Sequence, residues 1–131
     1  MFDVKGEVIP VTLDDVRLVA EYDDGTVVKG EHYIDEPEKD ISITKLSLDG
    51  DAKAYPQALE AISEADYIIL GPGDLYTTLL PNLLVKQVRD TMRKSDAKVI
   101  YISNLMTKIG QTRHKSLKEI VKIIENHIDK K

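Results

Sequence analysis

The stretch DYIILGPGDLYTT, residues 66–78, determines the expected fold. Its four apolar residues 67–70 form an uninterrupted run, which is typical of a strand in a sheet covered on both faces, as in α/β proteins. Gly71-Pro72-Gly73 then breaks the run. Ligands of such sheets bind outside the carboxyl ends of the strands, and a glycine-rich turn there can point backbone N–H groups at an anion. We therefore expect a ligand-binding loop that begins at Gly71.

The length and composition indicate one globular domain. The chain has 131 residues, of which 42% are hydrophobic and 31% charged. No apolar run approaches the ~20 residues that a membrane span requires, and the first residues lack the features of a signal peptide. The absence of cysteine excludes disulfides and thiol chemistry. We expect a cytoplasmic protein.

The net charge of -5 is unevenly distributed. Residues 1–66 carry a net charge of -11, and residues 67–131 carry +6. An acidic whole argues against nucleic-acid binding. Because the basic half contains the glycine loop, we expect an anionic small molecule as partner there. The positive charge of this half is explained equally well by lysines on solvent-exposed helix faces, such as Lys118 and Lys122.

The first part, residues 1–50, is expected to be rich in β-structure. Strands are predicted over residues 6–11, 16–22, 26–30 and 41–48, with a hairpin turn at Asp23-Asp24-Gly25. Pro10 makes the first of these a short edge strand. Residues 32–40 are polar and include Pro37, and are expected to form a loop.

The second part, residues 51–131, has the pattern of a parallel α/β unit. A helix beginning at Pro56 precedes the strand 67–70. A helix over 81–95, a strand over 98–103, a loop over 104–112 and a helix over 117–128 follow. This order predicts a parallel sheet with right-handed crossovers. Its two strands would each have an open edge, to be covered by the first part, another chain or further residues. The expected inward residues of the two later helices are Leu83, Leu84, Val88, Met92, Leu117, Ile120, Val121, Ile124 and Ile128.

Three ordered blocks carry a family resemblance. KGEVIPVTLDDVRLVAEYDDGTVVKGE, ADYIILGPGDLYTTLLPNLLV and VIYISNLMTKIGQT resemble the gluconeogenesis-factor family (YvcK-like), in the CofD-like superfamily of 2-phospho-L-lactate transferases. The resemblance implies a Rossmann-like three-layer α/β/α fold, partial here, with a cleft for nucleotides or nucleotide sugars. It covers roughly residues 5–125 and corresponds to the C-terminal part of the family. The family's N-terminal glycine-rich half has no counterpart, so a fragment, a split-gene product and a short paralogue remain open.

The candidate ligand-binding residues lie in the retained blocks. Gly71 and Gly73 permit positive φ and close backbone approach. Asp74 replaces the family's more frequent Ser. We expect it to cap the next turn, although it could instead contact a ribose or hold a cation. Asn104 ends the second strand and could contact a base or sugar, or be a turn residue. The full set is Gly71, Pro72, Gly73, Asp74, Tyr76, Thr77, Thr78, Asn104, Met106, Thr107 and, from the resemblance, Thr12.

Several of these residues have structural alternatives. Tyr76 could pack in the core, and Thr77 could cap a helix. Lys108 and Arg113 could pair with phosphate, although solvated positions fit them better. The three histidines, His32, His114 and His127, have no triad spacing, and we predict no catalytic residue and no metal site.

Three functions are compatible with this pattern. The first is a regulatory protein that binds a nucleotide such as a UDP-sugar or NAD without turnover, in central carbon metabolism or cell-envelope precursor balance. The second is a transferase like the 2-phospho-L-lactate transferases of deazaflavin coenzyme biosynthesis, with Mg as its cation. The third is a structural half that pairs with a separate N-terminal chain or with itself, as a homo-oligomer. We favour the first, with no cofactor assigned with certainty.

Overall fold

The computed structural model describes residues 5–37 and 40–128. The first part forms a three-stranded antiparallel sheet in the order β2-β1-β3, made of β1 (Leu18–Tyr22), β2 (Val27–Lys29) and β3 (Ile43–Leu48). The hairpin between β1 and β2 turns at Gly25, whose φ is 83°. The three strands and the turn confirm the sequence predictions. Leu18, Ala20 and Tyr22 alternate with less buried residues, so one face of β1 lies in the core.

A short helix, α1 (Glu31–Asp35), corrects the prediction of a loop over residues 32–40. Gly30 precedes it with a φ of 104°, which allows the chain to turn directly from β2 into the helix. The side chain of Ile34 is fully buried. The polar residues that flank Ile34 suggested a loop, whereas burial of this one apolar side chain accompanies a short helix.

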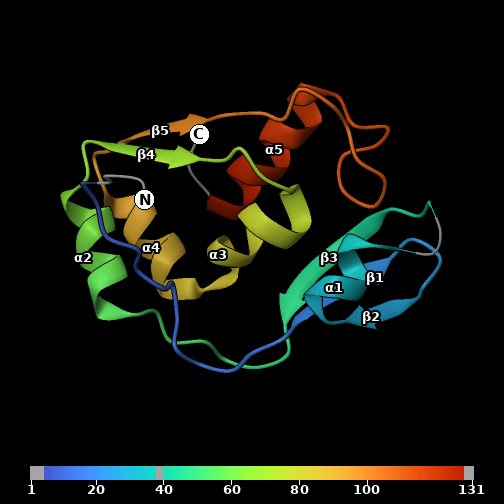
Figure 1. The fold of residues 1–131 in the computed structure, drawn as a ribbon, viewed down its shortest axis with the longest axis horizontal. Coiled ribbons are helices and arrows are strands. Elements are labelled where there is room, and N and C mark those ends of the chain that lie inside the picture. Colours follow the sequence, from blue (N-terminus) through green and yellow to red (C-terminus); the bar gives the residue numbers. More distant parts are fainter. Residues whose placement is uncertain (1–4, 38–39, 129–131) are drawn as a thin grey trace.

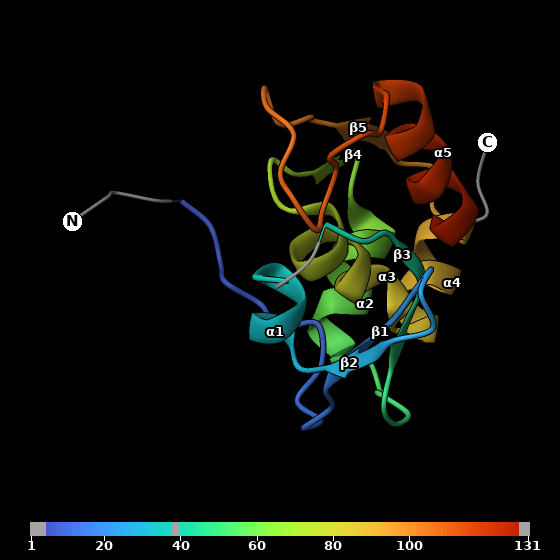
Figure 2. The same cartoon turned by 90° about the vertical axis from the view of Figure 1, so that its right-hand side faces the viewer.

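Residues 6–11 form no strand, and the prediction of an edge strand there is wrong. This segment runs away from the rest of the molecule (Figure 2), and the side chain of Val8 is fully exposed. The first pairing comes at Thr12, in an isolated antiparallel bridge with Ala54. Pro10 removes a backbone donor that a ladder would need.

The second part contains the predicted parallel pair, β4 (Tyr67–Leu70) and β5 (Lys98–Tyr101). Ile69 lies opposite Ile100 in the register. The helices lie on one side of this pair (Figure 1), and Tyr67 and Ile69 are 58% and 59% exposed on the other side. The α/β class is therefore confirmed, but the expectation that β4 is covered on both faces is wrong for the described residues.

The described residues of the second part form five helical elements: α2 (Pro56–Glu64), η1 (Leu75–Leu79), α3 (Leu80–Leu84), α4 (Lys86–Lys94) and α5 (Leu117–Ile128). The single helix predicted over 81–95 is divided at Val85, which is buried and extended with φ -69° and ψ 108°. A π-helix, η1, precedes it and begins at Leu75. The helix is interrupted at Val85, and the extended backbone there places the β-branched side chain in the core. None of the helices in the described residues is long and apolar enough to cross a membrane.

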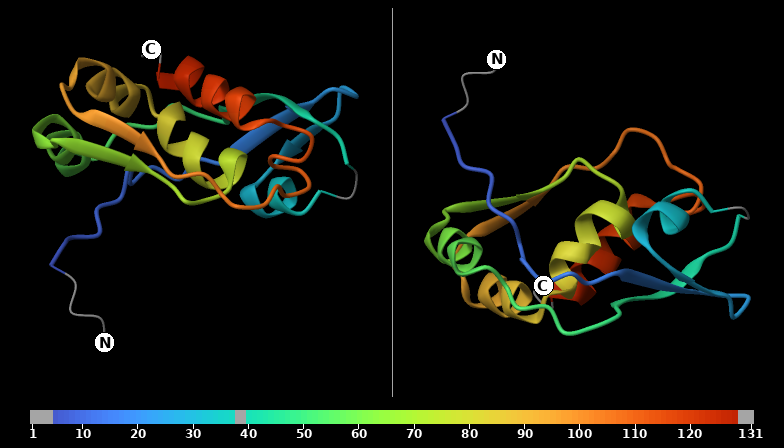
Figure 3. Two further views of the ribbon diagram at one scale, coloured as in Figure 1. Left: turned by 90° about the horizontal axis from the view of Figure 1, so that it is seen from above. Right: turned by 60° about the horizontal axis from the view of Figure 1, so that its bottom comes forward.

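The core lies between the two sheets, which occupy different ends of the molecule with α3 between them (Figure 3). Leu80 and Leu83 of α3 are at most 1% exposed. The predicted inward residues Val88, Met92, Ile120, Ile124 and Ile128 are buried as well. Leu84 and Val121, also predicted to face inward, are only half-buried. Leu117 is 57% exposed, because it lies in the first turn of α5, which Ser116 and Glu119 cap by reciprocal hydrogen bonds.

Candidate ligand-binding site

Two loops meet at the carboxyl ends of the parallel strands. We call residues 71–74, after β4, the glycine loop, and residues 102–112, after β5, the Asn104 loop. The Asn104 Nδ2 atom donates a hydrogen bond to the Gly73 carbonyl oxygen at 3.1 Å. Gly71 has a φ of 92°, and a Cβ atom on it would lie 2.6 Å from the Ile102 carbonyl oxygen. A side chain at position 71 would therefore push the two loops apart.

The glycine loop presents backbone N–H groups without partners. Among the described residues, the N–H groups of Gly71, Gly73 and Asp74 donate no hydrogen bond, and Pro72 has none to donate. Free backbone N–H groups in a turn are the kind of donor that an anion binds. These three groups are therefore the candidate anion-binding donors of the loop after β4.

A partly buried ion cluster lies beside the glycine loop. The Lys108 Nζ atom is 2.7 Å from Asp35 Oδ1 and 2.7 Å from Asp74 Oδ2. These three residues come from the Asn104 loop, the end of α1 and the glycine loop, so the cluster joins three segments that are distant in the sequence. With two carboxylates and one ammonium group, its formal charge is -1.

The titration of this cluster follows from its hydrogen bonds. The hydrogen bond from Lys108 lowers the pKa of Asp35 below its usual value, and the hydroxyl of Thr77 lowers it further. The hydrogen bonds to Asp35 and then to Asp74 raise the pKa of Lys108. Asp35 therefore stays ionised and Lys108 stays protonated at neutral pH.

The side chain of Gln111 hydrogen-bonds to residues of the cluster and to the backbone beside it. The sequence analysis did not include it among the candidate residues. Its side chain is 3% exposed. The Oε1 atom accepts from the Tyr76 N–H at 2.8 Å, while Nε2 donates to Asp35 Oδ1 at 3.2 Å and to Thr77 Oγ1 at 3.1 Å. Asp35 was also missed. It lay in a segment read as a polar loop, and no local pattern connects residues 35 and 111.

Several candidate residues have structural roles in this arrangement. Tyr76 is buried at 6% exposure and packs in the core, and burial raises the pKa of its hydroxyl. Thr77 is buried and donates to Asp35 at 3.1 Å rather than capping a helix. Asp74 precedes η1 but makes no side-chain cap, which corrects our preferred interpretation of that residue. Its carboxylate binds Lys108 instead.

The remaining candidates are distributed over two surfaces. Pro72, Asn104, Met106 and Thr107 are exposed around the glycine loop, and Thr78 is exposed on η1. Thr12 lies apart from this group and lines a hollow of about 230 Å³ together with Thr77 and Pro81.

The two basic residues and the histidines are also placed. Lys108 is held by carboxylates rather than solvated, contrary to our expectation, while Arg113 lies 3.3 Å from Asp40. His114 reaches the same carboxylate, and His127 bonds the Ile123 carbonyl. Within residues 5–37 and 40–128, no three His, Asp or Glu side chains are grouped so as to hold a metal ion.

Comparisons with known proteins identify relatives of the whole chain. The profile of the family described as 2-phospho-L-lactate transferase CofD matches residues 1–131. The gluconeogenesis factor of Bacillus subtilis is 40% identical over 131 residues, and that of Listeria monocytogenes is 41% identical over 127 residues. These matches cover 98% and 97% of this chain, but only 40% and 39% of the relatives.

Solved structures give the same result. The crystal structure of protein BH3568 from Bacillus halodurans matches with a TM-score of 0.87 and 38% identity, over 96% of this chain and 40% of that chain. A second crystal structure of that protein, described as a member of the UPF0052 family, matches with a TM-score of 0.88. The chain therefore spans about two fifths of the length of these relatives, and the Rossmann-like fold class is confirmed.

Proposed function

The chain belongs to the CofD family, and we propose that it binds a nucleotide or nucleotide sugar as a regulatory protein of the gluconeogenesis-factor type. The free N–H groups of the glycine loop at the carboxyl end of β4 are the observation that carries this proposal. Relatives at 40% and 41% identity bear the name gluconeogenesis factor. We place this role in the cytoplasm.

The pyrophosphate of the ligand would bind the N–H groups of Gly71, Gly73 and Asp74. Lys108 forms an ion pair with Asp74 at 2.7 Å, which reduces the repulsion between that carboxylate and a phosphate. Asn104 fixes the loop through the Gly73 carbonyl. The exposed side chains of Met106 and Thr107 would then contact the sugar or base.

Calorimetric titration of the chain with UDP-glucose, with NAD and GDP as comparisons, tests this proposal. Saturable binding of one of them is expected. Asn104→Ala should weaken it by about tenfold, since one positioning hydrogen bond is lost. Asn126→Ala, an exposed residue on α5, is the matched control and should leave affinity unchanged. Equal affinity of both variants would contradict the assignment of the site.

A second candidate function is transfer of a phospholactyl group, favoured by the description of the matching family. Mg-dependent consumption of a guanylylated donor distinguishes it from regulatory binding. In the same titration, GDP would then bind more tightly than UDP-glucose. Turnover of the donor would be measured by chromatographic separation of the donor from its products.

A further inference from the structure

The hollow between β3 and α5 has a positively charged lining, and we call it the basic groove. Its volume is about 380 Å³, and its basic lining residues are Lys45 of β3, Lys115 just before α5 and His127 of α5. None of the described residues that line it carries a carboxylate. The basic groove shares no lining residue with the glycine loop or the Asn104 loop, so it is separate from the candidate site described above.

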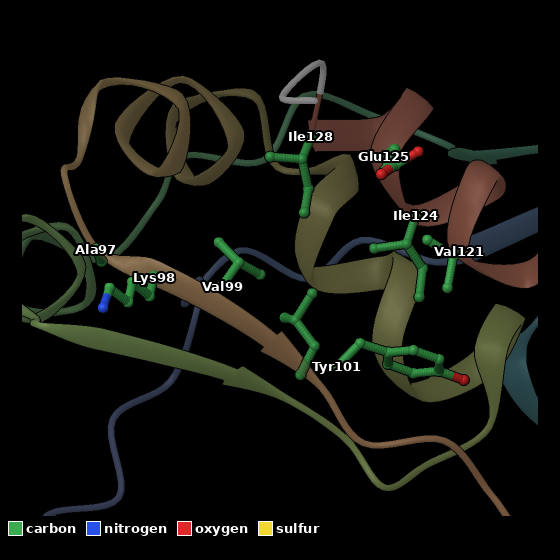
Figure 4. Close-up of a pocket in the computed structure, with 9 residues that line it drawn as sticks. Ala97, Lys98, Val99, Tyr101, Val121, Ile124, Glu125 and Ile128 are labelled. Atoms are coloured by element: carbon green, nitrogen blue, oxygen red, sulfur yellow. The ribbon is translucent and has the colours of Figure 1, made fainter.

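A second groove beside α5 has a different balance of charge. It lies between β5 and α5 (Figure 4), has a volume of about 420 Å³ and is lined mainly by apolar side chains such as Val99 and Ile124. Its two charged groups, Lys98 and Glu125, have opposite signs. An ion of either sign would therefore meet a like charge there, whereas the basic groove favours an anion.

A buried tyrosine supplies the basic groove with a hydrogen-bond donor. Tyr76 lines the groove and is 6% exposed. Within the described residues its hydroxyl makes no hydrogen bond, although its N–H donates to Gln111. Buried tyrosine hydroxyls usually have a partner, so one without a partner beside a groove indicates where a ligand atom can bind. Burial raises the pKa of this hydroxyl, which therefore stays protonated and can donate to an anion.

Lys115 is the cation of the groove that is not held by a carboxylate. Lys45 lies 2.6 Å from Glu21 and is engaged in that ion pair. Lys115 forms no ion pair among the described residues. It acts on Glu119 only at longer range, since the pKa of Glu119 is lowered chiefly by hydrogen bonds from Ser116 and least by Lys115. An ammonium group without such a partner can bind the head of an anion by a charge-assisted hydrogen bond.

The rest of the lining determines what kind of anion fits. The Nδ1 atom of His127 lies 2.8 Å from the Ile123 carbonyl oxygen and must donate to it, because a carbonyl oxygen can only accept. Nε2 is then the ring nitrogen left for a ligand. Ile43, Leu46 and Ile123 supply an aliphatic surface beside these polar groups. An inorganic ion would leave that surface in water, so an anion with an apolar body fits the groove better.

We propose that the basic groove binds a small organic anion, a carboxylate or a phosphate monoester with an apolar body. The anionic head would bind the Lys115 ammonium group and the Tyr76 hydroxyl, and the apolar body would cover Ile43 and Leu46. The volume of about 380 Å³ is within the range of small-molecule pockets. This site is additional to the proposed nucleotide site and does not depend on it.

Chemical-shift mapping by NMR on the isotope-labelled chain tests the proposal. Phenyl phosphate and benzoate are the anionic probes, and benzyl alcohol is the neutral probe. We expect the anions to shift the amide signals of residues 43–46 and 123–127 saturably. Benzyl alcohol should bind at least about tenfold more weakly, because it lacks the charge that Lys115 binds. The anion that binds more tightly identifies the head group that the groove prefers.

Substitutions with matched controls assign the two contacts. Lys115→Met should weaken phenyl phosphate binding by about tenfold, and its control is Lys122→Met, at an exposed lysine of α5 that does not line the groove. Tyr76→Phe removes only the hydroxyl and should weaken binding by about fivefold. Its control is Tyr22→Phe, because Tyr22 is 3% exposed and its hydroxyl also has no partner. Both controls should leave the affinity unchanged.

Three results would overturn the proposal. The first is that neither anion shifts the signals of residues 43–46 and 123–127, including the case in which only residues 71–74 of the glycine loop respond. The second is benzyl alcohol binding as tightly as the anions. The third is unchanged affinity in both Lys115→Met and Tyr76→Phe. Because Asn104→Ala should leave binding in the basic groove unchanged, failure of this proposal is distinguishable from failure of the proposed nucleotide site.

Discussion

The close approach of Gly71 to the Asn104 loop can be measured by comparing two glycine-to-alanine substitutions. Gly71 and Gly25 both have a positive φ, of 92° and 83°. A Cβ atom at position 71 would lie 2.6 Å from the Ile102 carbonyl oxygen, whereas one at position 25 has no atom within 4 Å. Both substitutions place alanine at a positive φ, and the two positions differ in the space available to the Cβ atom.

The expected magnitudes follow from this difference. Alanine at positive φ costs about 1 kcal/mol at either position. Restriction of the unfolded chain offsets part of this cost by a similar amount in both variants. Only Gly71→Ala must also displace a backbone oxygen, for about 1–3 kcal/mol more. For a chain of 131 residues, 1 kcal/mol corresponds to about 4 °C in Tm.

Urea and thermal unfolding followed by circular dichroism measure both variants. We expect Gly71→Ala to lower Tm by at least about 4 °C more than Gly25→Ala does. Equal losses in the two variants would refute the reasoning, because they would show that the loops after β4 and β5 do not press together at Gly71.

Three further predictions concern the ion cluster and the core. Because the pKa of Asp35 is lowered in the folded state, the unfolded state binds more protons in acid, so stability from Asp35 is present above pH 3.8 and is lost as the pH falls through the lowered pKa. Asp35→Asn should make the urea midpoint less dependent on pH in that range. Because the pKa of Lys108 is raised, its contribution is present below pH 10.5 and is lost as the pH rises through the higher folded value, and Lys108→Met should remove this loss. Leu80→Ala should lower the free energy of unfolding by about 2–5 kcal/mol, against less than about 0.5 kcal/mol for Leu117→Ala, since Leu80 is fully buried and Leu117 is 57% exposed; similar urea midpoints for the two would contradict this placement of the core.

Local chemistry made much of the fold predictable. The Asp-Gly turn at residues 24–25 identified the hairpin, and the helical spacing of Ile120, Ile124 and Ile128 identified the buried face of α5. The run 67–70 identified β4, but not its exposure. Burial of a strand depends on neighbours, and the alternate residues Tyr67 and Ile69 have none in the described chain.

The site was predictable only in part. The glycine loop and Asn104 were found because strand ends and glycines leave a local signature, and the structure brings them together. Asp35 and Gln111 were missed because their contacts within the cluster join residues that are 34 to 76 positions apart in the sequence. The division at Val85 was missed because tertiary burial overrides helical spacing.

The hydrogen bonds of the Gln111 amide should make substitutions at positions 111 and 35 depend on each other. It accepts from the Tyr76 N–H with one end and donates to Asp35 with the other, in a buried position. Glutamate at position 111 would retain the first bond and place a carboxylate against that of Asp35. A relative with Glu at the position equivalent to 111 should therefore carry a neutral or donating residue at that of 35, and the two positions should change together rather than singly.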